Sequence, residues 1–214
     1  MNGFRIGRVG LHAGWLAGVV FMVALLWLGA MAPGYEHGHM PVSFLGMRGV
    51  PLAAYWNCAG FIAPGLLVAW FALSLLAPLQ RDGVGAIARI GVWLLLISGL
   101  GFAGCGVFAY DATELDGPAS KLHVAMLTIA LLGFLPSALL LALGLRRRPA
   151  WRGLVVCGPL LALAALLSVT QRMGDFVPLL QGNPGHAHRI TLALYFLWLA
   201  LASWVALRSG RQRT

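Results

Sequence analysis

The chain has 214 residues, of which 60% are hydrophobic and only 10% are charged, and its mean hydropathy is +0.84. A soluble domain carries about 25% charged residues, so this composition excludes a water-soluble globular protein. It indicates an all-α bundle in lipid, where each helix satisfies its own backbone hydrogen bonds. The formal net charge is +9, but the arginines are spread through short loops beside apolar segments. That pattern argues against nucleic acid as a partner and favours contact with anionic membrane lipid.

Six apolar segments approach or exceed the roughly 20 residues that a bilayer-spanning helix needs. We predict transmembrane helices at Ala13–Ala32, Pro51–Ala77, Ile90–Tyr110, Leu122–Leu145, Gly153–Thr170 and Ile190–Leu207. The first segment follows Arg5 and Arg8 and resembles a signal peptide, but its apolar core is too long for one. We therefore expect an uncleaved helix. The chain, residues 1–214, is predicted to form a single six-helix membrane domain.

The distribution of cations predicts the orientation in the membrane. Eleven of the 15 arginines and lysines lie on one side of the predicted helices, and the other side holds Arg48, Lys121, Arg172 and Arg189. Because cytoplasmic loops carry the excess of cations, both termini are predicted to be cytoplasmic. The three outer loops are then Pro33–Val50, Asp111–Lys121 and Gln171–Arg189.

The acids and histidines gather on the outer side. Five of the six Asp and Glu residues and five of the six His residues lie in the three outer loops or at their edges. Charged residues are missing from the middle of every span, where ion-coupled transporters usually carry them. The pattern therefore disfavours active transport and predicts a polar site at the outer membrane–water boundary.

Two His-x-His pairs stand in the outer loops. The first pair is His37 and His39, and the second is His186 and His188. In an extended segment this spacing places both imidazoles on one side, and neutral imidazole is a ligand for zinc and copper. A zinc site is one interpretation. The alternatives are solvated loop histidines and histidines that serve in hydrogen bonding or proton transfer.

Asp111 and His123 stand at the two ends of the short second outer loop. A hydrogen bond between them would orient the imidazole and raise its basicity. We predict that the two side chains lie within hydrogen-bond reach, directly or through one water. One interpretation is a catalytic base or the support of a metal ligand. The other is a polar pair that fixes the hairpin.

Three further polar residues are candidates for the site. Ser43 is a candidate nucleophile, although no Gly-x-Ser-x-Gly context surrounds it and a capping or turn role is favoured. Arg189 can bind a lipid phosphate or carboxylate, or remain an interfacial cation. Asn57 lies inside the second span, where it either contacts a substrate or hydrogen-bonds a neighbouring helix.

Small residues crowd the third span from Ser98 to Gly106. Such residues allow helix backbones to approach closely in lipid. We expect them to serve helix packing, with a glycine-lined cleft for a lipid chain as the alternative.

Short motifs along the chain resemble one bacterial membrane family. Tyr35-Glu36-His37 followed by Pro41-Val42-Ser43-Phe44-Leu45-Gly46 resembles the Tyr-Ser-His…Ile-Ser-x-Leu-Gly stretch of the family called domain of unknown function 998. Asp111 with Leu122-His123 is similar to its Phe-x-x-Asp…Leu-His segment, and His188-Arg189-Ile190 occupies the place of its Gln-Arg-Ile. Glu36 and His188 depart from the residues common there. The resemblance implies a six-helix bacterial inner-membrane protein and supplies no activity.

These observations lead to two hypotheses of function. The first is a lipid-handling hydrolase at the outer boundary, assisted by zinc or by Asp111 and His123, loosely similar to the zinc-dependent membrane hydrolases of ceramide-type amides. The second is a non-enzymatic binding, sensor or accessory subunit that contacts another membrane protein. Stoichiometric metal in the purified protein would favour the first hypothesis.

Overall fold

The computed structural model describes residues 8–111, 113–114, 116–170 and 183–209. Within these ranges all regular structure is helical, and six helices are long and apolar enough to cross a membrane. These six spans are Arg8–Met31, Ala53–Arg81, Ala86–Val107, Pro118–Leu145, Pro149–Val169 and Pro184–Ser209. The prediction of an all-α protein with six membrane helices is confirmed.

The spans are built from several helical elements. The first span contains α2 (Ala13–Met31), and the second joins α3 (Ala53–Trp56), the π-helical segment η2 (Asn57–Ile62) and α4 (Ala63–Arg81). The third and fourth are α5 (Ala86–Val107) and α6 (Pro118–Leu145). The last two are η3 (Pro149–Trp151) with α7 (Arg152–Val169), and α8 (Pro184–Ser209). A short 3-10 helix, η1 (Val42–Gly46), lies between the first two spans.

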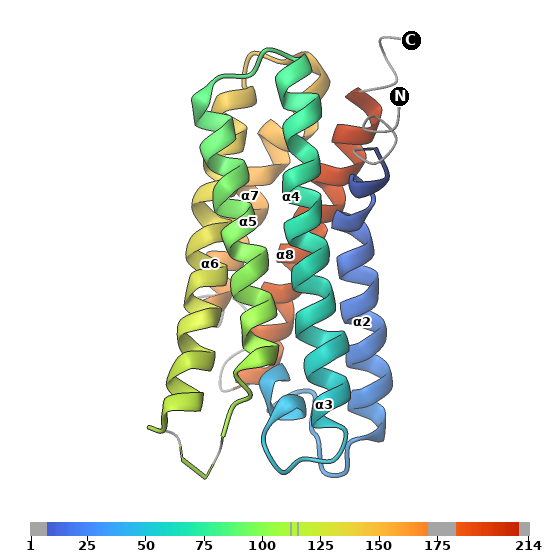
Figure 1. Cartoon of the computed structure of the whole chain (residues 1–214), viewed down its shortest axis with the longest axis vertical. Helices are drawn as coiled ribbons and strands as arrows, with labels where there is room; N and C mark the ends of the chain where they lie inside the picture. The colour runs from blue at the N-terminus through green and yellow to red at the C-terminus, as the bar shows by residue number, and fades with distance from the viewer. Residues whose placement is uncertain (1–7, 112, 115, 171–182, 210–214) are drawn as a thin grey trace.

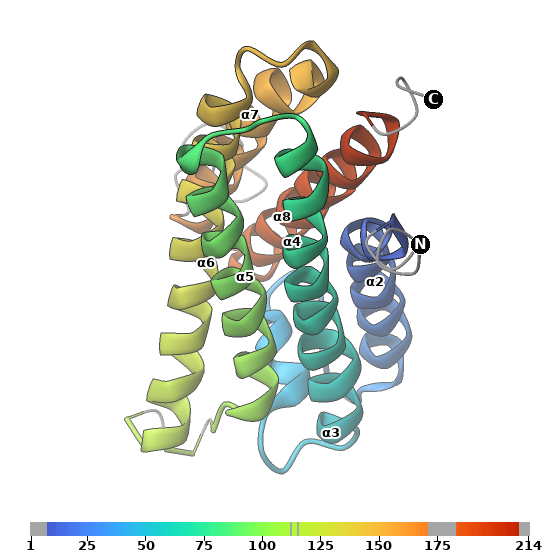
Figure 2. The ribbon, with the colours of Figure 1, turned by 45° about the horizontal axis from the view of Figure 1, so that its top comes forward.

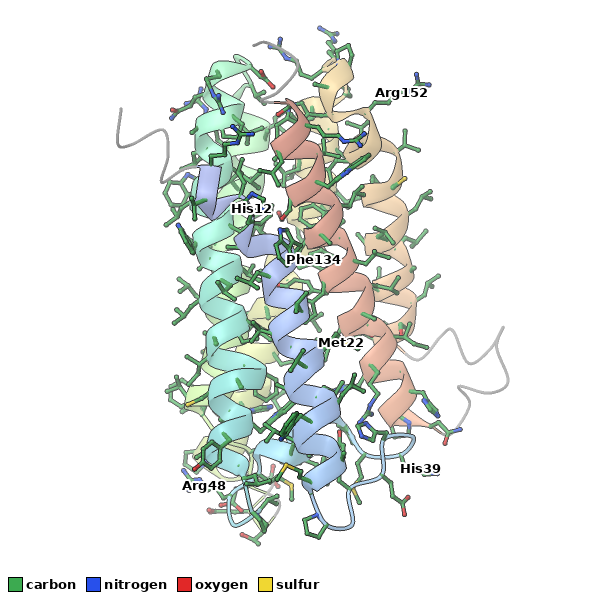
Figure 3. All side chains as sticks on the ribbon, turned by 90° about the vertical axis from the view of Figure 1, so that its right-hand side faces the viewer. His12, Met22, His39, Arg48, Phe134 and Arg152 are labelled. Atoms are coloured by element: carbon green, nitrogen blue, oxygen red, sulfur yellow. The ribbon has the colours of Figure 1, made fainter. Side chains whose placement is uncertain are left out.

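The six spans form a closed ring in chain order. Each packs against the next, from α2 through α4, α5, α6 and α7 to α8, and α8 returns to pack against α2 (Figure 1). In the tilted view α8 lies between α7 and α2 (Figure 2). The start of α2 and the end of α8 lie at the same end of the bundle. His39 and Arg48 lie at the opposite end from Arg152 (Figure 3).

Several spans begin earlier than predicted, among them the third, at Ala86 rather than Ile90, and two of the earlier starts bear on the site. The fourth span begins at Pro118 rather than Leu122, and the sixth begins at Pro184 rather than Ile190. Proline is favoured in the first turn of a helix because its missing N–H has no intrahelical partner there and its φ is already helical. The earlier starts place His123, His186 and His188 inside helices, which decides the geometry of the site.

Glycines bring α5 close to both of its neighbours. A Cβ added to Gly65 would lie 2.4 Å from the backbone nitrogen of Ala103, and one added to Gly99 would lie 2.7 Å from that of Ala69. On the other side of α5, a Cβ on Gly101 would lie 2.8 Å from the backbone nitrogen of Ala130. These glycines therefore serve backbone-to-backbone packing, which confirms the packing interpretation of the third span.

Aromatic side chains fill the ring on the side of η1. Phe21 stacks on Phe196 with ring centroids 4.8 Å apart, and it also meets Trp56 and Phe102 edge to face. Phe61, on the π-helical segment, contacts Phe102 at 5.4 Å. This cluster forms part of the apolar core beneath η1.

Candidate functional site

A small pocket lies where η1 and the spans α5, α6, α7 and α8 meet. The described residues that line it are Val42, Ser43, Phe61, Phe102, Cys105, His123, Leu127, Leu131, Val169, His188, Thr191 and Leu192. The space open to a water-sized molecule is about 30 Å³, which is room for about two waters. Three residues singled out from the sequence, Ser43, His123 and His188, therefore share one pocket.

His123 is the most firmly oriented of these residues. Its ring Nδ1 lies 3.0 Å from the carbonyl oxygen of Cys105 and 2.9 Å from that of Phe108. Carbonyl oxygens only accept hydrogen bonds, so Nδ1 must carry the proton. In neutral imidazole this leaves Nε2 as an acceptor, and none of the hydrogen bonds among the described residues uses it. The C-terminal end of α5 thus fixes the tautomer of His123.

Aromatic packing holds the His123 ring from two sides. Phe61 lies 5.8 Å from it, edge to face, and Tyr110 lies 5.8 Å away on another side. Phe61 belongs to the π-helical segment η2. Since a π-bulge shifts the register of the residues that follow it and is frequent at functional sites, the bulge is part of what places Phe61 against the histidine.

The other polar groups of the pocket are uncharged. Thr191 donates its hydroxyl proton to the Ala187 carbonyl at 2.9 Å, and the Cys105 thiol points to the His123 carbonyl at 3.9 Å. None of the described lining residues is Asp, Glu, Lys or Arg. The pocket therefore combines two imidazoles and two hydroxyls with an apolar wall, and it carries no permanent charge.

The segment that carries Ser43 is bound at both of its ends. Arg189, on α8, donates to the carbonyl of Met40 at 2.9 Å, just before η1. Asn57, on η2, donates to the carbonyl of Gly46 at 3.0 Å, at the end of η1. A Cβ on Gly46 would lie 2.1 Å from the Asn57 amide oxygen, so this approach requires glycine. Both residues predicted to bind substrate are thus placed to position Ser43.

Arg189 makes further hydrogen bonds to Tyr35 and to its own helix, α8. It donates to the Tyr35 hydroxyl and to the Gly185 carbonyl at 2.8 Å, and its Cζ lies 5.4 Å from the Tyr35 ring centroid. Burial raises the pKa of Tyr35, and the guanidinium partly offsets this rise. His37 contacts the Tyr35 ring at 5.1 Å, and its burial and Arg189 lower its pKa. This cluster joins the loop between the first two spans to the start of α8.

No direct hydrogen bond joins the side chains of Asp111 and His123, whose described partners lie elsewhere. The Asp111 carboxylate accepts from the Thr113 hydroxyl at 2.7 Å and lies 3.8 Å from Arg48. Hydrogen bonds from Thr113 are the main cause that lowers the Asp111 pKa. The contact across this hairpin is made by Ser120, whose hydroxyl accepts from the Asp111 N–H and donates to the Asp111 carbonyl. The Asp111 side chain therefore binds within its own loop, whereas the ring of His123 binds carbonyls at the C-terminal end of α5.

The premise of the predicted metal site is wrong for both His-x-His pairs. His37 and His39 lie in a turn rather than an extended segment, and His39 is exposed. His186 and His188 lie in α8, where residues two apart do not share a face. Among the described residues, no group of three or more His, Cys, Asp or Glu is arranged to hold a metal ion. Arg172, one of the four cations on the predicted outer side, lies outside the described residues.

Sequence reasoning missed Thr191, Cys105 and Tyr35 as members of the two clusters. Helical spacing could have found Thr191, because His188 and Thr191 are three residues apart and share a face of a helix that starts at Pro184. The roles of Cys105 and Tyr35 depend on contacts between segments that are distant in the sequence, and no local sequence pattern predicts them.

Six apolar spans in a closed ring, with a small, largely apolar pocket near one end, define a multi-pass helical membrane protein. The chain belongs to the family described as protein of unknown function (DUF998), whose model matches residues 15–206. No curated protein and no solved structure matches the chain. The family assignment agrees with the resemblance found in the motifs and leaves the activity open.

Proposed function

We propose that this chain is a lipid-handling hydrolase of the bacterial inner membrane, with its working pocket at the outer boundary. One observation carries the proposal. Ser43, His123 and His188 come from three distant parts of the chain and line one uncharged pocket. The eleven-to-four distribution of cations supports an orientation with both termini in the cytoplasm and the pocket near the outer side.

The reaction proposed is hydrolysis of an ester or amide bond. His123 Nε2 takes the proton of the Ser43 hydroxyl as its oxygen attacks the acyl carbon, and returns that proton to the leaving oxygen or nitrogen. A water then attacks the acyl-serine in the same way, so that the acid is released and the serine regenerated. In sum, one water is added across the bond. His188 would donate a hydrogen bond to the acyl oxygen as negative charge develops there.

The metal-free form of this chemistry is favoured by the donor geometry. A catalytic zinc site typically has three protein ligands, and among the described residues no group of three or more His, Cys, Asp or Glu is arranged to hold a metal ion. Of the four histidines in the His-x-His pairs, His188 alone is among the described lining residues. His37 packs on Tyr35, and His186 lies against Gly38. The pocket itself supplies a fixed imidazole whose free nitrogen is an acceptor, which is what a general base requires.

The test is turnover of fluorogenic acyl esters and acyl amides by the protein purified in a mild detergent. General acid–base catalysis contributes about 10²–10⁴ in rate, so His123→Asn and Ser43→Ala should each lose at least about a hundredfold. The Asn side-chain amide lies near the place of Nδ1 and can keep the bonds to the Cys105 and Phe108 carbonyls. His39→Gln, at an exposed position, is the matched control. Full turnover in both pocket variants would contradict the hydrolase, and binding without any turnover would favour the non-enzymatic alternative.

A further inference from the structure

We infer that the pocket takes the terminal hydroxyl group of a neutral lipid, and that it excludes lipids with a phosphate there. This inference names the class of substrate and rests on the proposed function only in taking this pocket as the working site. It follows from three features of the pocket: its free acceptors, its lack of a cation and the course of its apolar wall.

The polar atoms left unused in the pocket favour a ligand that donates hydrogen bonds. His123 Nε2 is an acceptor because Nδ1 carries the ring proton and donates it to the carbonyls of Cys105 and Phe108. The Thr191 hydroxyl donates its hydrogen bond to the Ala187 carbonyl, so its oxygen can only accept a further hydrogen bond. A hydroxyl on the ligand can donate to either atom and can also accept from the Ser43 hydroxyl or from the ring N–H of His188. A methyl ether or an ionised oxyanion can only accept, so it leaves His123 Nε2 and the Thr191 oxygen without a donor.

None of the described lining residues would supply a cation to a phosphate at the same place. Arg189 follows the lining residue His188 but does not itself line the pocket. Its two terminal nitrogens donate to Met40, Gly185 and Tyr35, and its buried Nε has no partner among the described residues. Arg48 has a side chain 61% exposed and pairs with Asp111 in the loops. Burying a phosphate without a charge partner is costly, so the pocket discriminates against phosphorylated head groups.

The apolar part of the ligand has a continuous wall to follow. Leu127 and Leu131 are four residues apart on α6 and share one face, and both line the pocket. Leu192 continues the wall on α8, and Val169 continues it on α7. Because Leu127 and Leu131 are only partly buried, a hydrocarbon chain can leave the pocket between these helices toward the lipid.

Three lipids with the same acyl chain separate these requirements. They are 1-oleoylglycerol, its 2,3-dimethyl ether and 1-oleoylglycerol 3-phosphate, and their binding is measured by native mass spectrometry of the protein in detergent. Only adducts lost in Leu131→Phe, which narrows the pocket, are counted as bound there. We expect 1-oleoylglycerol to bind about two- to tenfold tighter than its ether, the worth of one hydrogen bond. The phosphate should bind at least about tenfold more weakly than 1-oleoylglycerol.

His123→Asn tests the assigned acceptor directly. It should abolish the preference for 1-oleoylglycerol over its ether, whereas Arg48→Gln should keep it. Tighter binding of the phosphate at this site, or equal binding of the ether to the unaltered protein, would overturn the neutral-lipid inference while leaving the pocket as a lipid site. If none of the three lipids binds there, this inference is overturned, and turnover of acyl substrates decides separately whether the proposed function stands.

Discussion

The carbonyl of Gly46 is bound by a single side chain amide from another span, that of Asn57. We expect Asn57→Leu to lower the free energy of unfolding by about 1–3 kcal/mol, because a buried acceptor loses its donor. The measurement is thermal or denaturant unfolding in detergent. His39→Ala, at an exposed loop position, should change stability by less than about 0.5 kcal/mol. Equal stability of Asn57→Leu and the original protein would contradict the clamp at this end of η1.

Two arginines, Arg189 and Arg48, differ in burial and in hydrogen bonding, and their contributions to stability can be compared. Arg189 is partly buried and donates to two carbonyls and a tyrosine, whereas Arg48 is exposed and its nearest carboxylate oxygen is 3.8 Å away. We expect Arg189→Gln to cost about 1–3 kcal/mol of stability and Arg48→Gln about 0–1 kcal/mol. Unfolding of both variants measures the difference. The reverse order would show that Arg189 does not anchor the first outer loop.

His37 gives the outer cluster a dependence on pH. Burial and the neighbouring Arg189 lower its pKa from the ordinary value of 6.5, so the folded protein favours the neutral ring. As the pH falls below this value, the unfolded chain binds the proton first and stability decreases. We expect the thermal midpoint to fall from pH 7 toward pH 5, and to fall less in His37→Gln. Identical slopes for the two proteins would contradict a buried neutral His37.

At the scale of the elements, the packing of α5 against α4 depends on glycines that admit no side chain. A Cβ on Gly65 would stand 2.4 Å from backbone of α5, and backbone cannot move away as a flexible side chain can. We expect Gly65→Ala to destabilise the protein by about 1–3 kcal/mol, the usual cost of overpacking. Gly153→Ala, where the nearest atom lies 3.5 Å away, is the matched control and should be near neutral. Thermal unfolding of both variants distinguishes the two sites.

The first residues of α6 and α8 decide how much of the site could be predicted from the sequence. The six spans were predictable because apolar length is a strong signal for membrane helices. The geometry of the site was not predicted correctly, because α6 and α8 were predicted to start at Leu122 and Ile190 rather than at Pro118 and Pro184. In a loop, His186 and His188 can share a side; in α8 they cannot. Reading each proline as the first residue of its helix would have removed the zinc pair and kept His188 with Thr191.

Long-range contacts set the limit for the remaining residues. Sequence placed Ser43, His123 and His188 on the outer side, and the structure gathers all three in one pocket. It could not show that Asp111 binds Thr113, or that the ring of His123 turns to the carbonyls of Cys105 and Phe108. Those choices depend on the rotation of α5 relative to α6, which close glycine packing determines and no local pattern encodes.

For the whole molecule, the orientation in the membrane is a prediction from the positive-inside rule. Glu114 and Arg147 are both exposed and belong to connections at opposite ends of the bundle. A membrane-impermeant maleimide added to intact cells should label Glu114→Cys and spare Arg147→Cys, with the unaltered protein as the background control. Labelling of Arg147→Cys alone would reverse the orientation and place the pocket on the cytoplasmic side.

The central claim is that a lipid enters the pocket shared by Ser43, His123 and His188. Photocrosslinking tests it most directly, with a 1-oleoylglycerol that carries a diazirine in its acyl chain and with the protein reconstituted in vesicles. We expect the label on peptides of α6 and α8 that contain Leu127, Leu131 and Leu192, and we expect excess 1-oleoylglycerol to suppress it. Label spread over the lipid-facing sides of all six spans and unaffected by the competitor would contradict the claim.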